Sequence, residues 1–282
     1  MNQSKSYPKV LSIAGSDSSG GAGIQADLKT FSALGVYGAT AITAITAQNT
    51  QGVNSQFALE PQMVYDQIAA VMDDIEPSVV KIGMLSNTTI VEAVAKALHD
   101  YRPSFIVLDP VIVSSTGHRL LSIEAQETIK EKLIPIADLL TPNIPEMKAL
   151  TDSSLSSLEE KKEAAQQLFN LGAKAILLKG GHEEGEVKTD VLFVSQQTTD
   201  NGQQTLSMFT SETVVTKNTH GTGCTLSSAI AAFIARGLSL EDAISEAKNY
   251  VTEAIRAGAD VKIGKGIGPV NHAFNPQKMI VL

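Results

Sequence analysis

Cysteine is nearly absent from this sequence, because Cys224 is the only one among its 282 residues. A single cysteine excludes an internal disulfide framework and any zinc site built from several cysteines. Long apolar runs are also missing, since none reaches the roughly 18 residues that a membrane-spanning helix needs. The segment Met1–Pro8 lacks the apolar stretch of a secretory signal peptide. We therefore expect a cytoplasmic protein without a membrane partner.

Positive charge is scarce as well. The chain has 22 Lys and Arg against 30 Asp and Glu, which gives a formal net charge of −8 at pH 7. A protein whose main partner is nucleic acid needs a basic surface for the phosphate backbone, so this composition argues against such a partner. Nucleotides remain open as ligands, because a phosphate-binding pocket needs only a few cations and a bound metal ion can supply some of them.

Short aliphatic runs alternate with amphipathic helical patterns along most of the chain. This alternation predicts one α/β domain over residues 1–282, with a mainly parallel sheet between two helical layers. The polar region 183–216 is predicted to be a peripheral hairpin. The predicted strands are Val10–Ala14, Thr40–Thr46, Val79–Ile82, Phe105–Leu108, Leu139–Leu140 and Ala175–Leu178, and the predicted helices are Ala22–Leu34, Pro61–Asp74, Thr88–His99, Ile123–Leu133, Leu158–Leu171, Thr222–Arg236 and Leu240–Ala257.

The richest motif is the run Asn218–Leu226, where Gly221 and Gly223 flank Thr222 and an apolar helical pattern follows. Glycine lets the backbone approach a ligand closely. A helix beginning there leaves its first N–H groups without partners at the positive end of the helix dipole. The run therefore predicts an anion-binding loop, with a helix start that binds nothing as the alternative. Cys224 lies inside this loop, either as a small filler beside the ligand or as a reactive thiol.

A second glycine-rich segment, Gly15–Gly23, follows the first predicted strand and opens the first helix. Its spacing does not fit the Gly-x-Gly-x-x-Gly pattern of dinucleotide-binding folds, which disfavours an oxidoreductase. Asp27 on this helix is either a first-turn acid that complements the dipole or a buried carboxylate that accepts from a substrate. Gln48 ends the second predicted strand, where its amide either pairs with a heterocycle or is a simple strand-end polar group.

Polar side chains also follow three later strands. Asp109 ends one strand, Asn143 and Glu146 follow the next, and Lys179 ends the one after that. Carboxylates at one sheet edge suit Mg²⁺, and a lysine among them suits a transferred phosphate. Each has an ordinary alternative, since Asn143 fits a helix cap and a surface lysine is unremarkable. His220, before the anion loop, is either a base or a structural hydrogen-bonding group. Together these groups indicate phosphoryl transfer, which needs positioning and charge stabilisation.

Several blocks of the sequence resemble the bacterial hydroxymethylpyrimidine/phosphomethylpyrimidine kinases of thiamine biosynthesis, members of the ribokinase-like superfamily. The blocks stand in the family's order and span nearly the whole chain. They are Ile13–Thr30, Ala47–Val53, Lys81–Leu85, Asp109–Val111, Thr141–Glu146, Lys179–His182, Asn218–Thr225 and Gly264–Val270. The resemblance implies a ribokinase-like three-layer fold, a homodimer as in much of the family, and an ATP- and Mg²⁺-dependent kinase acting on 4-amino-5-hydroxymethyl-2-methylpyrimidine and then on its monophosphate.

The resemblance also implies roles for residues. Gly15, Asp27, Gln48, Met84 and Val111 are expected to bind the pyrimidine. Asp109 and Glu146 are expected to organise Mg²⁺, whereas Asn143, Thr222 and Lys179 are expected to contact the nucleotide and its phosphates. Gly221, Gly223 and Cys224 are expected to form the anion hole.

Cys224 stands where many sugar kinases of the superfamily have an aspartate base. A thiol can replace that base if its pKa is lowered, which a helix N-terminus can do. We therefore expect Cys224 to act either as the base or as a lining of the anion hole. Two other functions stay open: a pyridoxal or pyridoxine kinase, alone or with dual specificity, and a non-catalytic vitamer sensor. Gln48 favours the pyrimidine, because its amide can meet an amino group and a ring nitrogen.

Overall fold

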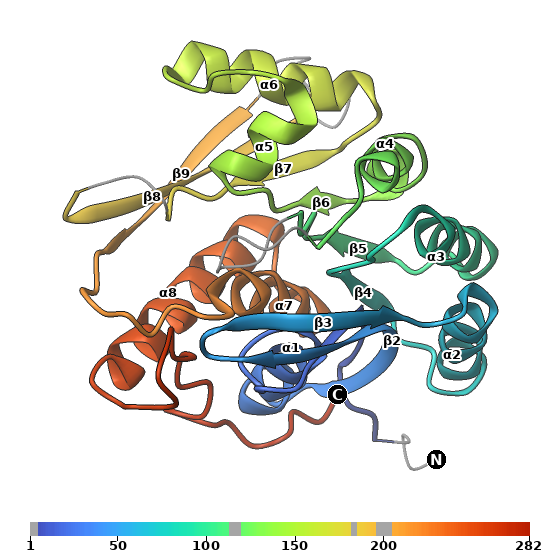
Figure 1. The fold of residues 1–282 in the computed structure, drawn as a ribbon, viewed down its shortest axis with the longest axis horizontal. Helices are drawn as coiled ribbons and strands as arrows, with labels where there is room; N and C mark the ends of the chain where they lie inside the picture. The colour runs from blue at the N-terminus through green and yellow to red at the C-terminus, as the bar shows by residue number, and fades with distance from the viewer. Residues whose placement is uncertain (1–4, 113–119, 182–184, 196–204) are drawn as a thin grey trace.

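The computed structural model describes residues 5–112, 120–181, 185–195 and 205–282. Within these residues the centre of the molecule is one nine-stranded sheet (Figure 1). The strands are β1 (Lys9–Asp17), β2 (Tyr37–Asn49), β3 (Gly52–Ala58), β4 (Val79–Ile82), β5 (Phe105–Leu108), β6 (Leu139–Leu140), β7 (Ala175–Leu178), β8 (Val187–Val194) and β9 (Thr205–Glu212).

The order of strands in the sheet is β3-β2-β1-β4-β5-β6-β7-β8-β9. The strands from β2 to β7 in this order run parallel, whereas β3, β8 and β9 pair antiparallel at the two edges. All residues of β4 and of β7 are buried, as expected of strands that helices cover on both faces. The carboxyl ends of the parallel strands therefore share one edge of the sheet.

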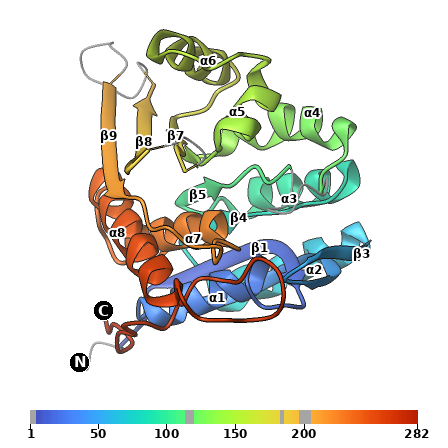
Figure 2. The same ribbon diagram turned by 60° about the vertical axis from the view of Figure 1, so that its left-hand side comes forward.

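Helices cover both faces of this sheet, as Figure 2 shows. One apolar core lies beneath α2, α3, α4 and α6, and a second lies beneath α1, α7 and α8. Among the described residues, no helix is long and apolar enough to cross a membrane. The helices are α1 (Gly23–Ala33), α2 (Pro61–Asp74), α3 (Thr88–Tyr101), α4 (Ile123–Lys132), α5 (Ile144–Thr151), α6 (Leu158–Asn170), α7 (Thr222–Ala235) and α8 (Leu240–Gly258), with a short 3-10 turn at Ile134–Ile136.

The predicted three-layer α/β fold with a mainly parallel sheet is confirmed. The predicted hairpin is also present, as β8 and β9. Besides the short 3-10 turn, one strand and one helix were not predicted. Strand β3 is mostly exposed and polar, so it shows no apolar run. Helix α5 has 8 residues, too few for a clear amphipathic period, and begins at an Asn143 cap.

Candidate active site

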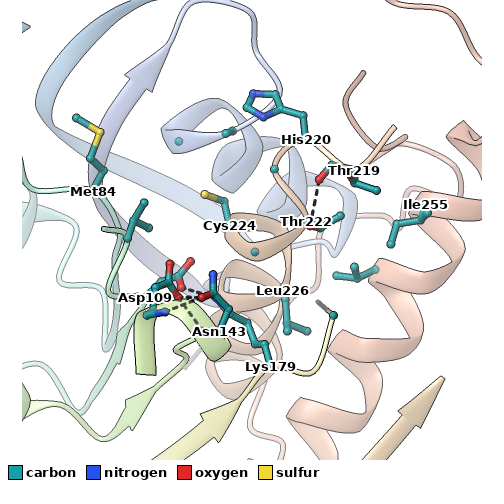
Figure 3. Close-up of a pocket in the computed structure, with 18 of the residues that line it drawn as sticks. Met84, Asp109, Asn143, Lys179, Thr219, His220, Thr222, Cys224, Leu226 and Ile255 are labelled. Atoms are coloured by element: carbon teal, nitrogen blue, oxygen red, sulfur yellow. Dashed lines mark hydrogen bonds and ion pairs between the residues drawn. The ribbon is translucent and has the colours of Figure 1, made fainter. Parts of the chain in front are cut away.

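A cavity of about 730 Å³ opens at the carboxyl ends of the parallel strands. This is the edge where open α/β sheets bind their ligands. Side chains from β1, β2, β8, α5, α7 and α8, and from the segments that follow β4, β5 and β7, line the cavity. In Figure 3, Asp109, Asn143 and Lys179 lie close together, Met84 and His220 lie apart from this group and from each other, and Cys224 lies in the middle of the view.

Lys179 is the centre of a buried charge cluster. Its Nζ lies 2.8 Å from Asp109 Oδ1 and 3.7 Å from Glu146 Oε2. Asp109 also accepts hydrogen bonds from the hydroxyls of Thr141 and Ser227, each at 3.2 Å. The predicted convergence of one lysine and two acids at the sheet edge is therefore present in the structure.

The charges of this cluster do not balance. Burial and the neighbouring Asp109 carboxylate raise the pKa of Glu146 to about 7, although Lys179 acts in the opposite direction. The pKa of Asp109 is lowered, because Lys179 and Lys81 outweigh the cost of its burial. The pKa of Lys179 is raised by the same two acids. One lysine does not compensate two carboxylates, and a further cation would stabilise Glu146 in its ionised form.

Mg²⁺ fits this site through few protein ligands. Among the described residues, no group of three or more His, Cys, Asp or Glu side chains forms a metal cage. Mg²⁺ is commonly held by one or two carboxylates together with water and substrate phosphates, so Asp109 and Glu146 are sufficient. The observation that supports the fit is that two buried carboxylates, those of Asp109 and Glu146, share one lysine, at 2.8 and 3.7 Å.

The loop that the sequence predicts to bind an anion forms the start of α7. Gly221 is the N-cap of α7 with φ +81°, a left-handed conformation that favours glycine. A Cβ on Gly221 would lie 1.8 Å from the carbonyl oxygen of Gly21, so no side chain fits there. Two glycine loops, far apart in the sequence, thus touch each other at the cavity. Gly223 and Thr222 line the cavity in the first turn of α7, where N–H groups lack helical partners.

Cys224 lines the cavity in the same turn, but its thiol is not poised to ionise. Burial raises its pKa to about 11, against the opposing effect of Lys81. A thiol of this pKa is protonated at neutral pH, so the lowered pKa that a base role requires is not found. We therefore favour the lining role of Cys224 in the anion hole over the role of base.

The first prediction concerns this thiol. We expect Cys224→Ala to keep kcat within about tenfold of the wild type, because removing a true general base costs roughly 10²–10⁴-fold. The measurement is steady-state kcat across pH 6–9, with Cys224→Ser as the control of similar size. A loss in the higher range for Cys224→Ala would restore the base role.

Asp17 organises the other glycine loop, a role that the sequence did not indicate. Its carboxylate accepts the Ser19 N–H at 2.8 Å, the Gly21 N–H at 3.1 Å, the Ala22 N–H at 2.9 Å, and also the Ser19 hydroxyl at 2.7 Å. His220 Nε2 lies 2.8 Å from the same carboxylate. Although burial opposes ionisation, these hydrogen bonds lower the pKa of Asp17 to about 2. The loop is therefore held in shape before any ligand binds.

This contact also assigns the hydrogen on His220. Because Asp17 is ionised and acts only as an acceptor, His220 Nε2 donates to it. Gln48 Nε2 lies 3.3 Å from the same ring nitrogen. Both nitrogens carry hydrogen as donors, so neither accepts a hydrogen bond from the other. The amide of Gln48 lines the cavity and can hydrogen-bond a ligand. Of the two alternatives for His220, the structure favours the structural hydrogen-bonding role.

Of the remaining residues predicted to bind the pyrimidine, three line the cavity and Asp27 does not. Gly15, Met84 and Val111 line the cavity, and a Cβ on Gly15 would lie 3.2 Å from the Met84 sulfur. Met84 packs in a small apolar cluster with Ala44, Leu120 and Val111. This part of the cavity therefore offers an apolar wall beside the Gln48 amide.

Asp27 does not lie where the sequence analysis predicted it. It is fully buried and lies outside the lining of the cavity. Its carboxylate accepts from the hydroxyls of Ser12 and Ser228, each at 2.6 Å, and pairs with Lys81 Nζ at 3.0 Å. The expected contact of Asp27 with the pyrimidine is therefore not met. The sequence did not indicate this position of Asp27, because Lys81, the residue that pairs with it, lies inside an otherwise apolar strand.

A C-terminal segment of the family resemblance, Gly264–Pro269, joins two walls of the cavity. The Gly266 N–H donates to the Thr50 hydroxyl at 3.1 Å, and the His220 N–H donates to the Gly268 carbonyl at 3.0 Å. A Cβ on Gly266 would lie 2.0 Å from the carbonyl oxygen of Thr50. The glycines allow this segment to tie the turn between β2 and β3 to the loop before α7.

The opposite half of the cavity was not predicted from the sequence. It is lined by β8, the residues that end and follow β9, and one face of α7 and α8. Its apolar members are Val214, Leu226, Val251 and Ile255. Asn143, expected near the nucleotide, lines the cavity and also caps α5 by accepting the Glu146 N–H at 2.9 Å. The helix-cap interpretation of Asn143 is therefore confirmed, and its contact with the nucleotide stays a prediction.

Comparisons with known proteins show which proteins this chain is similar to. The family model described as phosphomethylpyrimidine kinase matches residues 17–271. A hydroxymethylpyrimidine/phosphomethylpyrimidine kinase of Escherichia coli is 46% identical over 93% of this chain and 96% of its own length. A thiamine biosynthesis bifunctional protein of Geobacter sulfurreducens is 46% identical over 96% of this chain. This chain spans 54% of that longer relative.

Solved structures show the same architecture. A phosphomethylpyrimidine kinase from Clostridium difficile superimposes with a TM-score of 0.75 and 43% identity, covering 88% of this chain and 99% of that one. An ADP complex of a Bacillus subtilis pyridoxal kinase superimposes with a TM-score of 0.84 and 36% identity, covering 95% of this chain and 98% of that one. The chain is therefore similar to kinases of two related vitamin substrates.

Proposed function

Because this chain belongs to the phosphomethylpyrimidine kinase family, we propose that it phosphorylates 4-amino-5-hydroxymethyl-2-methylpyrimidine and then its monophosphate. The fold is the ribokinase-like one that the resemblance implies. The observation that carries the proposal is one cavity that combines the Gln48 amide, an apolar wall, the anion loop and the Lys179 cluster. The product would be the pyrimidine diphosphate used for thiamine.

ATP is the proposed phosphoryl donor, which the ADP complex of the Bacillus subtilis pyridoxal kinase supports. We assign its adenosine to the half of the cavity with Val214, Val251 and Ile255, since apolar walls suit a heterocyclic base. Asp109 and Glu146 would hold Mg²⁺, which when bound neutralises the charge on the phosphates. The acceptor hydroxyl would lie between Gln48 and the anion loop.

The chain's own residues supply positioning and charge. Lys179 is placed to stabilise the transferred phosphoryl group, because its ammonium lies in the cavity wall next to both acids. The N–H groups at the start of α7 would donate to the same group. Phosphoryl transfer requires little covalent chemistry from the protein, so a protonated Cys224 is compatible with it.

The test is ATP consumption with the hydroxymethylpyrimidine, its monophosphate and pyridoxal offered separately, with product masses measured for each. Diphosphate from the pyrimidine is the expected result. Turnover of pyridoxal alone would move the chain to vitamin B6 salvage. ATP consumption that is the same with and without each compound would contradict both functions, and no turnover at all would favour the vitamer sensor.

The second prediction concerns selectivity between the two vitamins. We expect Gln48→Met to lower kcat/KM for the pyrimidine about 10- to 100-fold, because an amide that pairs with an amino group and a ring nitrogen is lost. The value for pyridoxal should change little. Gln51→Met, an exposed change in the adjacent turn, is the control. An unchanged ratio in the Gln48 variant would contradict the pyrimidine-binding role.

A homodimer remains a prediction from the family resemblance, and a cytoplasmic location remains a prediction from the sequence pattern. An apolar pair on the sheet edge is compatible with a dimer, since Ile45 and Phe57 face each other across β2 and β3 and are 49% and 69% exposed. Gel filtration with light scattering tests the oligomeric state directly.

A further inference from the structure

Another buried ion pair lies in the cavity wall, outside the cluster of Lys179 and its two acids. Asp190 on β8 and Lys248 on α8 are 4% and 7% exposed, and Lys248 Nζ lies 2.7 Å from Asp190 Oδ2. Both residues line the cavity. Neither residue belongs to the blocks of the family resemblance. The pair therefore needs a physical explanation of its own.

The second carboxylate oxygen of Asp190 indicates what this ion pair does. Oδ1 accepts the backbone N–H of Gly180 at 2.9 Å, and Gly180 directly follows Lys179. On the other side of Lys179, its own N–H donates to the Pro142 carbonyl at 2.9 Å. The backbone of Lys179 is thus fixed by one hydrogen bond at its own amide and by another at the amide after it.

The carboxylate is a stronger acceptor than a neutral group. A hydrogen bond from a backbone N–H to an ionised acceptor is shorter and roughly twice as strong as a neutral one. A buried carboxylate without a partner is costly, so Lys248 supplies the compensating charge. Because Lys248 belongs to α8, the pair also connects the helix that carries Val251 and Ile255 to the turn after Lys179.

We propose that Asp190, compensated by Lys248, is a positioning residue that aims Lys179 at the phosphoryl group through the Gly180 amide. The proposal rests on the proposed function, in which Lys179 acts on the transferred group. Asp190 makes no contact with substrate in this role. Its effect is therefore expected in kcat, with the KM for the acceptor left nearly unchanged.

Two double variants isolate the hydrogen bond from the ion pair. Asp190→Asn with Lys248→Met keeps an acceptor for the Gly180 N–H and leaves no buried charge, whereas Asp190→Ala with Lys248→Met removes the acceptor as well. We expect the first to keep kcat within about threefold of the wild type. We expect the second to lose about 10- to 100-fold in kcat, the range typical of lost support for a reacting group. The KM for the acceptor should change less than threefold in both.

Equal kcat values for the two double variants would overturn the proposal. The ion pair would then only stabilise the fold. If the alanine variant does not fold, Asp190→Glu replaces it, since this change keeps the charge next to Lys248 but moves the acceptor. The amide resonance of Gly180 in ¹⁵N-glycine-labelled protein is the independent readout. It should move upfield when the carboxylate is lost, whatever substrate the enzyme uses. All kinetics use the acceptor that the wild type phosphorylates, so a different substrate would refute only the proposed function.

Discussion

Replacement of Lys179 by methionine is expected to lower kcat by about 10³-fold. The ammonium is the one cation that lies between Asp109 and Glu146 among the described residues, at 2.8 and 3.7 Å. Removing one preorganised donor aimed at developing charge costs roughly 10²–10³-fold, and here the two acids also lose their compensating charge. The measurement is single-turnover phosphoryl transfer with saturating ATP and pyrimidine.

The matched control is Lys174→Met. Lys174 has a comparable ion pair with Asp138 at 2.6 Å, but its side chain is 51% exposed. We expect no change in kcat from this variant, because exposed pairs contribute little. Binding of the pyrimidine to the Lys179 variant should be followed by calorimetry, since the chain has no tryptophan. Preserved pyrimidine binding with preserved turnover would contradict the role of Lys179.

Glu146→Gln is expected to lower the activity and to raise the stability of the protein. We expect kcat/KM to fall about 10²-fold or more, because a carboxylate proposed to hold Mg²⁺ is lost. In the protein without ligands, the same change should raise the free energy of unfolding at pH 8 by about 1–3 kcal/mol. Glutamine still serves the capping box of α5, in which the Glu146 side chain accepts the Asn143 N–H at 2.8 Å.

The sign follows from the pKa of Glu146, which is raised from 4.5 to about 7 by folding. Below about pH 4.5 the carboxyl is neutral in both states, so wild type and variant should be equally stable. As the pH rises through 7, the wild type loses stability relative to the variant. Mg²⁺ affinity of the wild type should increase over the same interval, because the cation competes with the proton. Thermal unfolding at pH 4.5 and pH 8 measures the first effect.

Glu127→Gln is the control for this prediction. Glu127 pairs with Lys130 at 2.9 Å on α4, and its side chain is 60% exposed. Neither activity nor the pH dependence of stability should change in this variant. A Glu146→Gln variant that is destabilised at pH 8 would show that the carboxylate is held ionised by its surroundings.

Much of the site was predictable because parallel strands end at one edge. Asp109 and Lys179 each follow an uninterrupted apolar run, so their convergence needs only the βαβ rule. The network of Asp17 was not predictable, since nothing in Ser-Asp-Ser-Ser indicates a partner 203 residues away. The position of Asp27 was not predictable for a similar reason, because Lys81, which pairs with it, belongs to a strand that is otherwise apolar. The half of the cavity with Val214 and Ile255 offers only ordinary aliphatic residues, which are indistinguishable from core.

The separation between Asp17 and His220 has a consequence for folding. These two side chains lie 203 residues apart in the chain, and Asp27 and Ser228 lie 201 apart. Contacts of such length form late, because closing a long loop costs entropy before the contact stabilises anything. A refolding chain can therefore complete most of its parallel sheet and still lack a joined pair of glycine loops. The ability to bind an anion should appear in the last kinetic phase, which makes ligand binding a reporter of completed folding.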